Sequence, residues 1–350
     1  MTHLINAAID YGLFLLEAAT IVIAVGLVIG WLLTAAAELR SRKQETLKIT
    51  HVNEQLERKA DKLAETLLNA KEKKARNKQK KSEAKQRQKA EKLGRKHEPN
   101  RLFVIDFKGD IRASPVDSLR ESINALLQVA EVGDEVLLRL ESGGGMVHSY
   151  GLAASQLARL RDAGMHLTVA VDQVAASGGY LMACVAERIV AAPFAIVGSI
   201  GVVAQLPNFN RFLKDKDIDF DVYTAGQHKR TVTVFGENTE AGRQKFVEEL
   251  EDVHGLFKSF VADYRPSLDI ESVATGEHWH GTQALDLNLI DEIGTSDDVM
   301  LAAARDQRNV YTIDSRERGS VWQRMTGEAA RLLNRLGNGG GVAVDWRRPS

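Results

Sequence analysis

Hydrophobic residues along the chain are first concentrated in one uncharged run near the N-terminus. The run covers residues 18–37 and is bounded by Glu17 and Glu38. Over this length an α-helix rises about 30 Å, which is the thickness of the hydrocarbon core of a bilayer. A cleaved signal peptide is the alternative, with Ala35 and Ala37 as the small-residue pattern. However, residues 1–17 contain no lysine or arginine, and the run exceeds a typical signal-peptide core. We therefore expect residues 1–38 to be an uncleaved membrane anchor.

The next zone, residues 39–99, is mostly polar and basic. From Arg40 to Pro99 the chain carries 20 Lys and Arg but only 9 Asp and Glu, and it has no Phe, Tyr or Trp. A thin stripe of Leu and Val fades after Leu67, which is typical of a solvated helical stalk. Lysine tracts of this kind usually lie near anionic lipid or stay in solvent. A lipid bilayer is therefore expected as a partner, and nucleic acid is not.

From Leu102 onward, short apolar runs alternate with longer stretches of mixed character. The runs predict strands and the stretches between them predict helices, which together indicate an α/β domain with strands buried on both faces. We place this domain at residues 100–305, followed by a basic tail at 306–350. The stretch 322–336 of the tail is amphipathic and suits a membrane surface or a protein partner. The predicted strands are residues 102–107, 136–140, 167–171 and 188–192, and the predicted helices are residues 116–130, 147–163, 176–186 and 240–264.

A second uncharged run, residues 189–206, has almost the length of a membrane span. Pro193, Gly198 and Gly201 interrupt it, and β-branched residues are frequent in it. Buried strands and a turn are therefore expected here, rather than a second crossing of the membrane.

The net charge of −1 conceals a strongly basic stalk and an acidic remainder. Such a division is typical of a basic appendage joined to a separate globular domain. The single cysteine, Cys184, excludes a framework of intramolecular disulfides.

Three segments carry the candidate chemistry: ESGGGMV at 141–147, AASGGY at 175–180 and AGQHKRT at 225–231. Glycines in the first let a backbone N–H approach a substrate oxygen closely. In the second, Ser177 follows a strand and opens a helix, so its hydroxyl is exposed and the Gly178 N–H is free to stabilise an oxyanion. An ordinary N-cap serine has the same placement. In the third, Lys229 is a candidate base, although composition alone indicates a surface lysine, since lysine accepts a proton at neutral pH only where burial disfavours its charge.

Together these segments resemble the signal peptide peptidase A family of serine/lysine proteases, and the whole chain resembles its SohB branch. The family pattern has a serine in A-S-G-G-Y, a glycine-rich oxyanion loop upstream and a lysine downstream. Ser177 and Lys229, 52 residues apart, fit this order. Ser199 in VGSIGV matches the family serine that orients the lysine, and residues 275–294 match the stretch that closes the domain. Gly143 stands where the family loop commonly has proline, so the loop lacks that fixed backbone angle.

The resemblance implies a crotonase-like α/β fold of the kind that Clp proteases share, behind a single N-terminal transmembrane helix. It also implies assembly into a homo-oligomeric ring. Ser177 would be the nucleophile, Lys229 the base and Ser199 its orienting partner. Gly178 and Gly144, with Gly145 as the fallback, would hold the oxyanion. The expected substrates are peptides such as signal-peptide remnants or membrane-protein fragments, and no metal or other cofactor is required.

Two other classes of function stay open, namely a crotonase-type acyl-CoA enzyme and a non-catalytic peptide-binding membrane scaffold. A histidine base, either His148 or His228, is disfavoured because no motif marks the carboxylate that would orient it. We expect a single-pass protein of the bacterial inner membrane. The basic residues that follow the run 18–37 place the domain in the cytoplasm, whereas the resemblance points to the outer side, so the side stays open.

Overall fold

The structure is a computed structural model, and it describes residues 12–13, 16, 18–26, 30, 46–92, 101–131, 133–226 and 228–316. The chain divides into two compact units, residues 1–47 with 315–350 and residues 48–314. The second unit contains most of the main sheet and the pocket.

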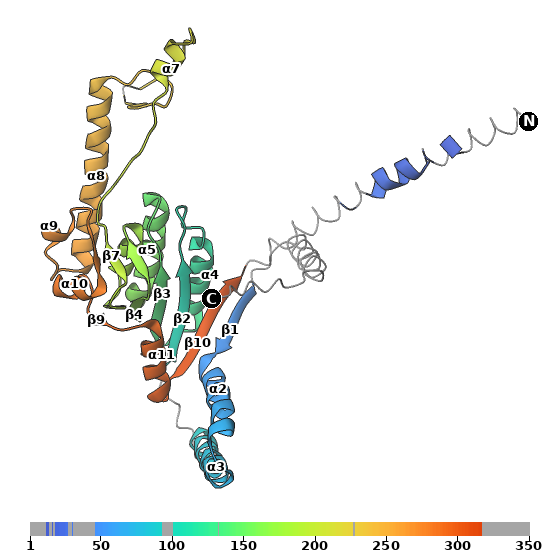
Figure 1. Cartoon of the computed structure of the whole chain (residues 1–350). Coiled ribbons are helices and arrows are strands. Elements are labelled where there is room, and N and C mark those ends of the chain that lie inside the picture. Colours follow the sequence, from blue (N-terminus) through green and yellow to red (C-terminus); the bar gives the residue numbers. More distant parts are fainter. Residues whose placement is uncertain are drawn as a thin grey trace, which may run out of the picture. The chain divides into compact units, whose positions relative to one another are not determined.

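A seven-stranded sheet in the order β1-β10-β2-β3-β4-β6-β9 forms the centre of the fold (Figure 1). The neighbours from β10 to β9 all pair in parallel. This confirms the α/β class that the alternating pattern predicts, since parallel strands require crossover connections. The strands are β1 (Thr46–His51), β2 (Arg101–Lys108), β3 (Glu135–Glu141), β4 (His166–Val171), β6 (Arg188–Ala191), β9 (Glu292–Ile293) and β10 (Asn309–Arg316).

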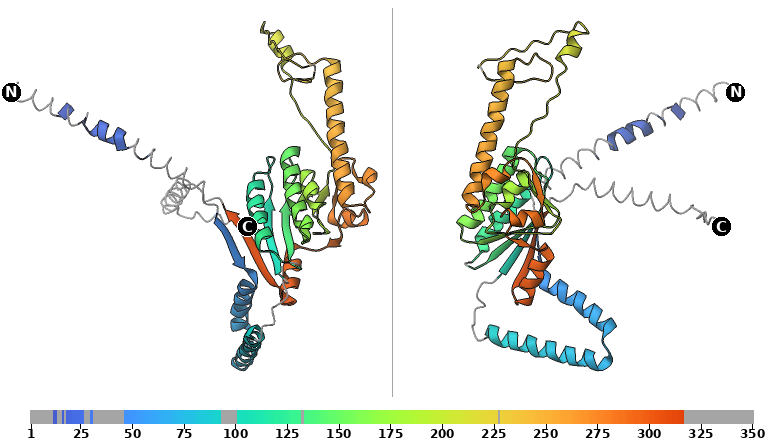
Figure 2. Two further views of the ribbon diagram at one scale, coloured as in Figure 1. Left: turned by 180° about the vertical axis from the view of Figure 1, so that it is seen from behind. Right: turned by 60° about the vertical axis from the view of Figure 1, so that its left-hand side comes forward.

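Helices cover both faces of this sheet (Figures 1 and 2). On one face, α4 (Val116–Val129), α5 (Val147–Asp162) and α6 (Gly178–Ala183) share the larger apolar core with side chains of β2, β3 and β4. On the other face, Met300 and Ala303 of α11 (Ser296–Arg305) pack with the alternate residues of the same strands. Burial on both faces explains why these strands are apolar at nearly every position.

A second, three-stranded sheet lies beside the first and was not expected from the sequence. It consists of β5 (Val174–Ala176), β7 (Ile196–Gly198) and β8 (His278–His280), with β5 parallel to β7 and β8 antiparallel to it. The uncharged run 189–206 contributes β6 and β7 with a turn between them. The interpretation of this run as buried strands is therefore confirmed.

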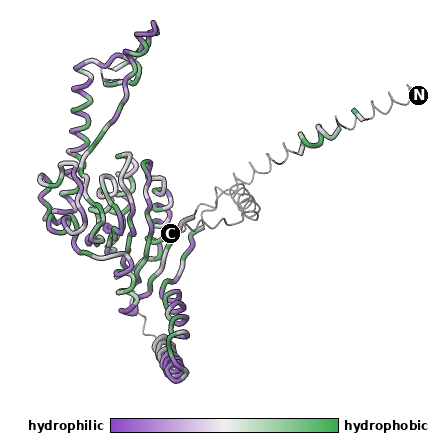
Figure 3. Tube along the Cα trace, viewed as in Figure 1, coloured by the Kyte–Doolittle hydropathy of each residue, from purple (hydrophilic) through white to green (hydrophobic). Residues whose placement is uncertain are grey.

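The main sheet extends on both sides of the expected domain 100–305. It takes β1 from the zone expected to be a stalk and β10 from the zone expected to be a tail. Asn53, at the start of α2 (Val52–Leu67), fixes this edge because its side chain donates to the Arg308 carbonyl and accepts from Val310 N–H, both at 2.8 Å. Beyond α2, α3 (Ala70–Lys92) is largely hydrophilic, in contrast to the apolar strands (Figure 3).

The expected anchor at 18–37 falls only partly within the described residues. Residues 18–26 are helical, while residues 27–29 and 31–37 lie outside the described part of the chain. Among the described residues, no helix has the length and apolar character that a membrane crossing requires. The amphipathic stretch 322–336 also lies outside the described residues.

A long helix, α8 (Glu240–Tyr264), stands at the far end of the sheet from β1 and confirms the predicted helix 240–264. The segment between β7 and α8 runs out along α8, carries the short helix α7 (Asn210–Lys214) and joins the N-terminal end of α8, which leads the chain back to the sheet (Figure 1). We call residues 204–239 the projecting segment. Arg265 fixes the other end of α8, since its guanidinium donates to both carboxylate oxygens of Asp291 at 2.8 Å. The short helices α9 (Ile270–Val273) and α10 (Gly281–Asp286) follow.

Asp134 links the starts of two neighbouring central strands. Its fully buried carboxylate accepts hydrogen bonds from Arg101 Nε at 3.0 Å, from Arg101 N at 3.2 Å and from Glu131 N at 2.9 Å. Burial acts to raise the pKa of Asp134, but the hydrogen bonds and the charge of Arg101 outweigh it, so the pKa is lowered overall.

We predict that Asp134→Asn lowers the free energy of unfolding at neutral pH by about 2–3 kcal/mol, because the Arg101 guanidinium loses its charged partner. The native pKa lies below the unfolded value of about 3.9, so the carboxylate's contribution is complete above that value. It disappears as the pH falls through the native pKa. Urea unfolding across a pH series should therefore show the wild type and the variant converging in acid.

The matched control is Asp117→Asn, because the Asp117–Arg120 ion pair lies on the surface of α4. It should change the free energy of unfolding by less than about 1 kcal/mol. If the difference in free energy of unfolding between wild type and Asp134→Asn stayed constant into strong acid, it would contradict the role described for the Asp134 carboxylate.

Candidate active site

The candidate site forms where the carboxyl ends of β3, β5 and β7 meet. Ser142, directly after β3, bridges to Ala175 of β5, and its N–H and carbonyl bond to Val174 and Ala176 at 2.8 and 2.9 Å. On the other side of β5, Ala176 pairs with Gly198 of β7. Because all three strands run in the same direction, the residues that follow them reach the same edge. Those residues are the glycines 143–145, Ser177 and Ser199.

Ser177 occupies a backbone conformation that non-glycine residues rarely adopt, with φ 51° and ψ −118°. Ser177 N–H donates to the Gly198 carbonyl at 2.8 Å, and its own carbonyl accepts from Leu181 N–H at 3.0 Å. The sharp turn between β5 and α6 is thus held from both sides. Strained residues of this kind cluster at functional sites, because the surrounding structure must stabilise them.

The glycine loop lies directly against this turn. At Gly144, where φ is +89°, a Cβ atom would come within 2.8 Å of Ser177 Cβ and of the Gly178 nitrogen. The Gly144 N–H donates to Ser142 Oγ at 3.0 Å. The Gly145 N–H has no hydrogen-bond partner in the described part of the chain. Only glycine allows this close approach of loop and turn.

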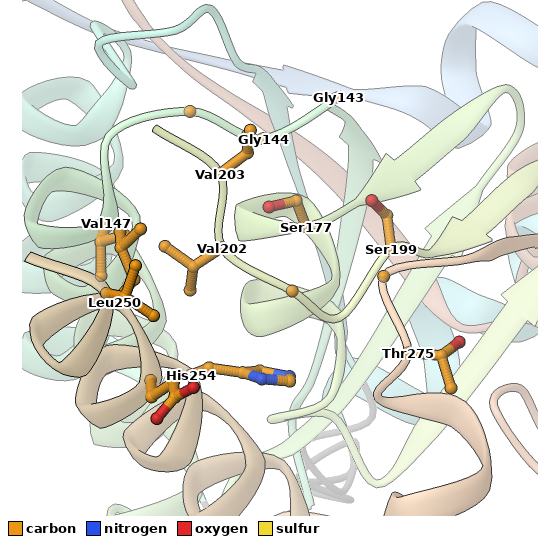
Figure 4. Close-up of a pocket in the computed structure, with 15 residues that line it drawn as sticks. Gly143, Gly144, Val147, Ser177, Ser199, Val202, Val203, Leu250, His254 and Thr275 are labelled. Atoms are coloured by element: carbon orange, nitrogen blue, oxygen red, sulfur yellow. The ribbon is translucent and has the colours of Figure 1, made fainter. Parts of the chain in front are cut away.

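Ser177 and Ser199 line a common pocket of about 670 Å³, which Figure 4 shows. The glycine loop forms one wall, and one face of α8 forms the opposite wall. Much of the lining is apolar, and both hydroxyls belong to half-buried residues, so the pocket offers apolar surface next to two hydroxyl groups. The apolar lining residues are Val147, Val202, Val203, Val247 and Leu250.

His254 is a pocket residue that sequence reasoning missed. It lies on α8 across the pocket from Ser177 (Figure 4), and its Nε2 atom is buried with no hydrogen-bond partner among the described residues. A buried imidazole nitrogen without a partner is costly, so His254 Nε2 can bond to a polar group that enters the pocket. The only available signal was its helical spacing from Val247 and Leu250, which is also the spacing of an ordinary apolar face.

Lys229 is exposed and is not among the residues that line the pocket. It lies in the projecting segment, and the nearby Thr231 carbonyl packs against Gly242 in the first turn of α8. In an α-helix the step from Gly242 to His254 is about 18 Å along the axis. Within a single chain, Ser177, Ser199 and the glycines 143–145 therefore meet at the pocket, whereas Lys229 does not. His148 and His228 are exposed and also do not line the pocket.

Comparisons with known proteins assign the chain to a family. Residues 6–157 match the N-terminal part of peptidase family S49, and residues 159–311 match peptidase family S49 itself. The chain belongs to peptidase family S49. The first match contains the glycine loop, and the second contains Ser177, Ser199 and Lys229.

Relatives of this S49 chain agree with the resemblance to the SohB branch. The chain is 54% identical over 305 residues to the probable protease SohB of Haemophilus influenzae, covering 85% of this chain and 86% of that one. It is 48% identical over 301 residues to the probable protease SohB of Buchnera aphidicola subsp. Schlechtendalia chinensis, covering 84% of this chain and 98% of that one.

Among solved structures, a similar one is the 1510-N membrane protease specific for a stomatin homolog from Pyrococcus horikoshii. Its identity is 14% and its TM-score 0.34, and the match covers 58% of this chain and 78% of that one. The ClpP protease catalytic domain from Plasmodium falciparum has 10% identity and a TM-score of 0.35, with 55% and 85% covered.

The contact between the glycine loop and the Ser177 turn can be tested by its effect on the stability of this S49 chain. We predict that Gly144→Ala lowers the free energy of unfolding by about 2 kcal/mol or more, because it combines a positive φ with contacts that no flexible side chain can relieve. Gly143→Ala is the matched control, since a Cβ atom there meets nothing within 4 Å. Thermal unfolding of both variants is the measurement, and equal melting temperatures would contradict the described packing of the loop.

Proposed function

We propose that this chain is a serine endopeptidase with Ser177 as the nucleophile. One observation carries the proposal: the strained Ser177 turn, the glycine loop and Ser199 converge on a pocket large enough for a peptide. This convergence is what acyl transfer requires, namely an exposed nucleophile next to backbone amides that can hold an oxyanion. Membership of a peptidase family supports the choice of an amide substrate.

The proposed reaction uses these groups together with Lys229, which the family resemblance indicates as the base. Ser177 Oγ attacks the carbonyl carbon of the scissile bond while its proton passes to the neutral amine of Lys229. The Gly178 N–H and the Gly145 N–H stabilise the oxyanion, because the Gly144 N–H, the other loop amide considered, is already donated to Ser142 Oγ. When the intermediate collapses, the C–N bond breaks and Lys229 gives the proton to the leaving amine. Water then attacks the acyl-enzyme with Lys229 as base, which releases the acid and restores Ser177.

We further propose that Lys229 acts on Ser177 of a neighbouring copy in a homo-oligomer. Within one chain Lys229 is exposed and separated from the pocket along α8. The projecting segment also exposes large apolar side chains, including Phe212 at 59% and Tyr223 at 91%. Such surfaces mark protein contacts. Packing of this segment on a second copy would cover them and desolvate Lys229, which favours its neutral form. Ser199, next to Ser177, is then placed to orient the lysine.

We predict that Ser177→Ala, Lys229→Ala and Lys229→Arg each lower the rate of peptide hydrolysis at least about 1,000-fold, since arginine stays protonated. Lys216→Ala is the matched control, an exposed lysine of the same projecting segment, and it should keep wild-type activity. Full activity of Lys229→Arg would remove the lysine base from the mechanism.

Mixing two inactive variants distinguishes a Lys229 that acts on Ser177 of its own chain from one that acts on a neighbouring copy. If Lys229 serves a neighbouring copy, equal amounts of Ser177→Ala and Lys229→Ala subunits, unfolded and reassembled together, should regain about a quarter of the wild-type activity. A mixture as inactive as its components would show that the lysine acts within its own chain.

For the cellular setting, we propose an anchor at residues 18–37 in the bacterial inner membrane, with the catalytic domain on the cytoplasmic side that the positive-inside rule favours. Peptide remnants of signal sequences or membrane proteins are the expected substrates, and a crotonase/Clp-like fold and a ring are the expected architecture. Cys184 is buried, so Lys71→Cys introduces a single accessible thiol on α3. An impermeant maleimide should label it only after cell lysis, and labelling in intact cells would place the domain outside.

A further inference from the structure

A buried chain of hydrogen bonds supports the glycine loop from beneath. Gly144 N–H donates to Ser142 Oγ at 3.0 Å, Ser142 Oγ lies 2.6 Å from Tyr150 Oη, and Tyr150 Oη donates to the Asp110 carbonyl oxygen at 2.7 Å. Ser142 and Tyr150 are exposed by only 2% and 0%. In such a dry environment each of these bonds is stronger, and the loss of any one leaves a buried polar group without a partner.

The Asp110 carbonyl oxygen fixes the direction of each hydrogen bond in this series. A carbonyl oxygen can only accept, so the one proton of Tyr150 is committed to Asp110. The Ser142 hydroxyl must then donate to Tyr150 Oη, which leaves the lone pairs of Ser142 Oγ for the Gly144 N–H. A phenol keeps its proton at neutral pH, and burial raises the pKa of Tyr150 further. Every donor is used once, and the Gly144 peptide has one preferred orientation.

Tyr150 also contacts the other side of the candidate oxyanion hole. Its ring packs against Gly178, where a Cβ atom would lie 2.8 Å from Tyr150 Cβ and Cδ2. Phe107 meets the same ring edge-on, with the ring centroids 6.4 Å apart, and Gly109 leaves room for Ser142 Oγ. The ring of Tyr150 therefore contacts Gly178, and the hydroxyl of the same side chain supports the glycine loop through Ser142.

We propose that Tyr150 and Ser142 are positioning residues that set the distance between the glycine loop and the Ser177–Gly178 turn, and thereby the geometry of the oxyanion hole. Neither residue touches the substrate. They act by holding the Gly144 peptide in place, so that the loop and Gly178 amides are arranged before the tetrahedral intermediate forms. The inference rests on the proposed function, because it takes Ser177 as the nucleophile.

The test compares Tyr150→Phe, Ser142→Ala and the double variant of the full chain, assayed on one peptide substrate. Each single variant should lower kcat at least about tenfold and change KM less than about twofold, because an oxyanion hole acts on the transition state and not on the bound substrate. The double variant should be no slower than the slower single variant, since both substitutions break the same chain. Ser122→Ala is the matched control: it removes another buried hydroxyl, which donates to the Ser118 carbonyl of α4 at 2.9 Å, and should leave kcat unchanged.

A second readout excludes a merely structural effect. A peptide aldehyde forms a hemiacetal with Ser177 whose oxygen occupies the oxyanion hole, whereas the matching peptide alcohol binds without that bond. In Tyr150→Phe the inhibition constant of the aldehyde should rise about tenfold or more, and that of the alcohol should change less than about twofold. Ser142→Ala carries the same test if Tyr150→Phe does not fold.

Wild-type kcat in both single variants, or equal losses for aldehyde and alcohol, would overturn the inference. The Ser177→Ala variant keeps this failure distinct from that of the proposed function. If Ser177→Ala hydrolyses the peptide, the proposed function fails. If Ser177→Ala is inactive while Tyr150→Phe and Ser142→Ala turn over normally, only the positioning role fails.

Discussion

Two backbone hydrogen bonds at Ser142 join the main sheet to the small sheet, whose strands lead into Ser177 and Ser199. Through its N–H and its carbonyl, Ser142 extends β3 onto β5, with bonds of 2.8 and 2.9 Å. This pairing places the glycine loop beside the Ser177 turn, and the parallel pairing of β5 with β7 places Ser199 on the other side. Without it, the residues around positions 142, 177 and 199 would lack a common edge.

The close approach of the glycine loop to the Ser177 turn explains why so many small residues lie at this edge of the sheets. Once loop and turn approach this closely, Gly144 has no room for a side chain, and Gly178 and Gly179 pack on Tyr150 and on the Ser142 carbonyl. The strain at Ser177 follows from the same geometry, because the chain must turn sharply from β5 into α6. The larger core, which includes fully buried Tyr150, Leu157 and Val169, holds the turn in this conformation.

The sequence predicts the parts of this structure that depend on local pattern. Apolar runs buried on both faces predict β2, β3, β4 and β6, and the serine followed by two glycines marks the turn at Ser177. The small sheet has three-residue strands that are too short to leave a periodic signal. β1 and β10 join the sheet through pairings distant in sequence, and composition placed them in a stalk and a tail. His254 and Tyr150 sit at ordinary helical positions, so their roles emerge only when α5 and α8 are placed against the strand ends.

The position of Lys229 shows the limit of motif spacing most clearly. A separation of 52 residues from Ser177 fits the family order but does not say which path the chain takes between them. Here that path runs out along α8 to the N-terminal end of that helix (Figure 1), so the lysine and the serine of one chain do not meet in the pocket. The physical alternative is a second copy, which would also cover the apolar side chains of the projecting segment.

The central claim, that Ser177 is a protease nucleophile, is tested most directly by an alkyl fluorophosphonate. The probe reacts with an activated serine hydroxyl and marks its position for peptide mass spectrometry. We predict a single modified residue, Ser177, in the active full-length protein, with loss of peptide hydrolysis in proportion to labelling. Modification of Ser199 in place of Ser177, or hydrolysis that continues after Ser177 is fully modified, would contradict the account.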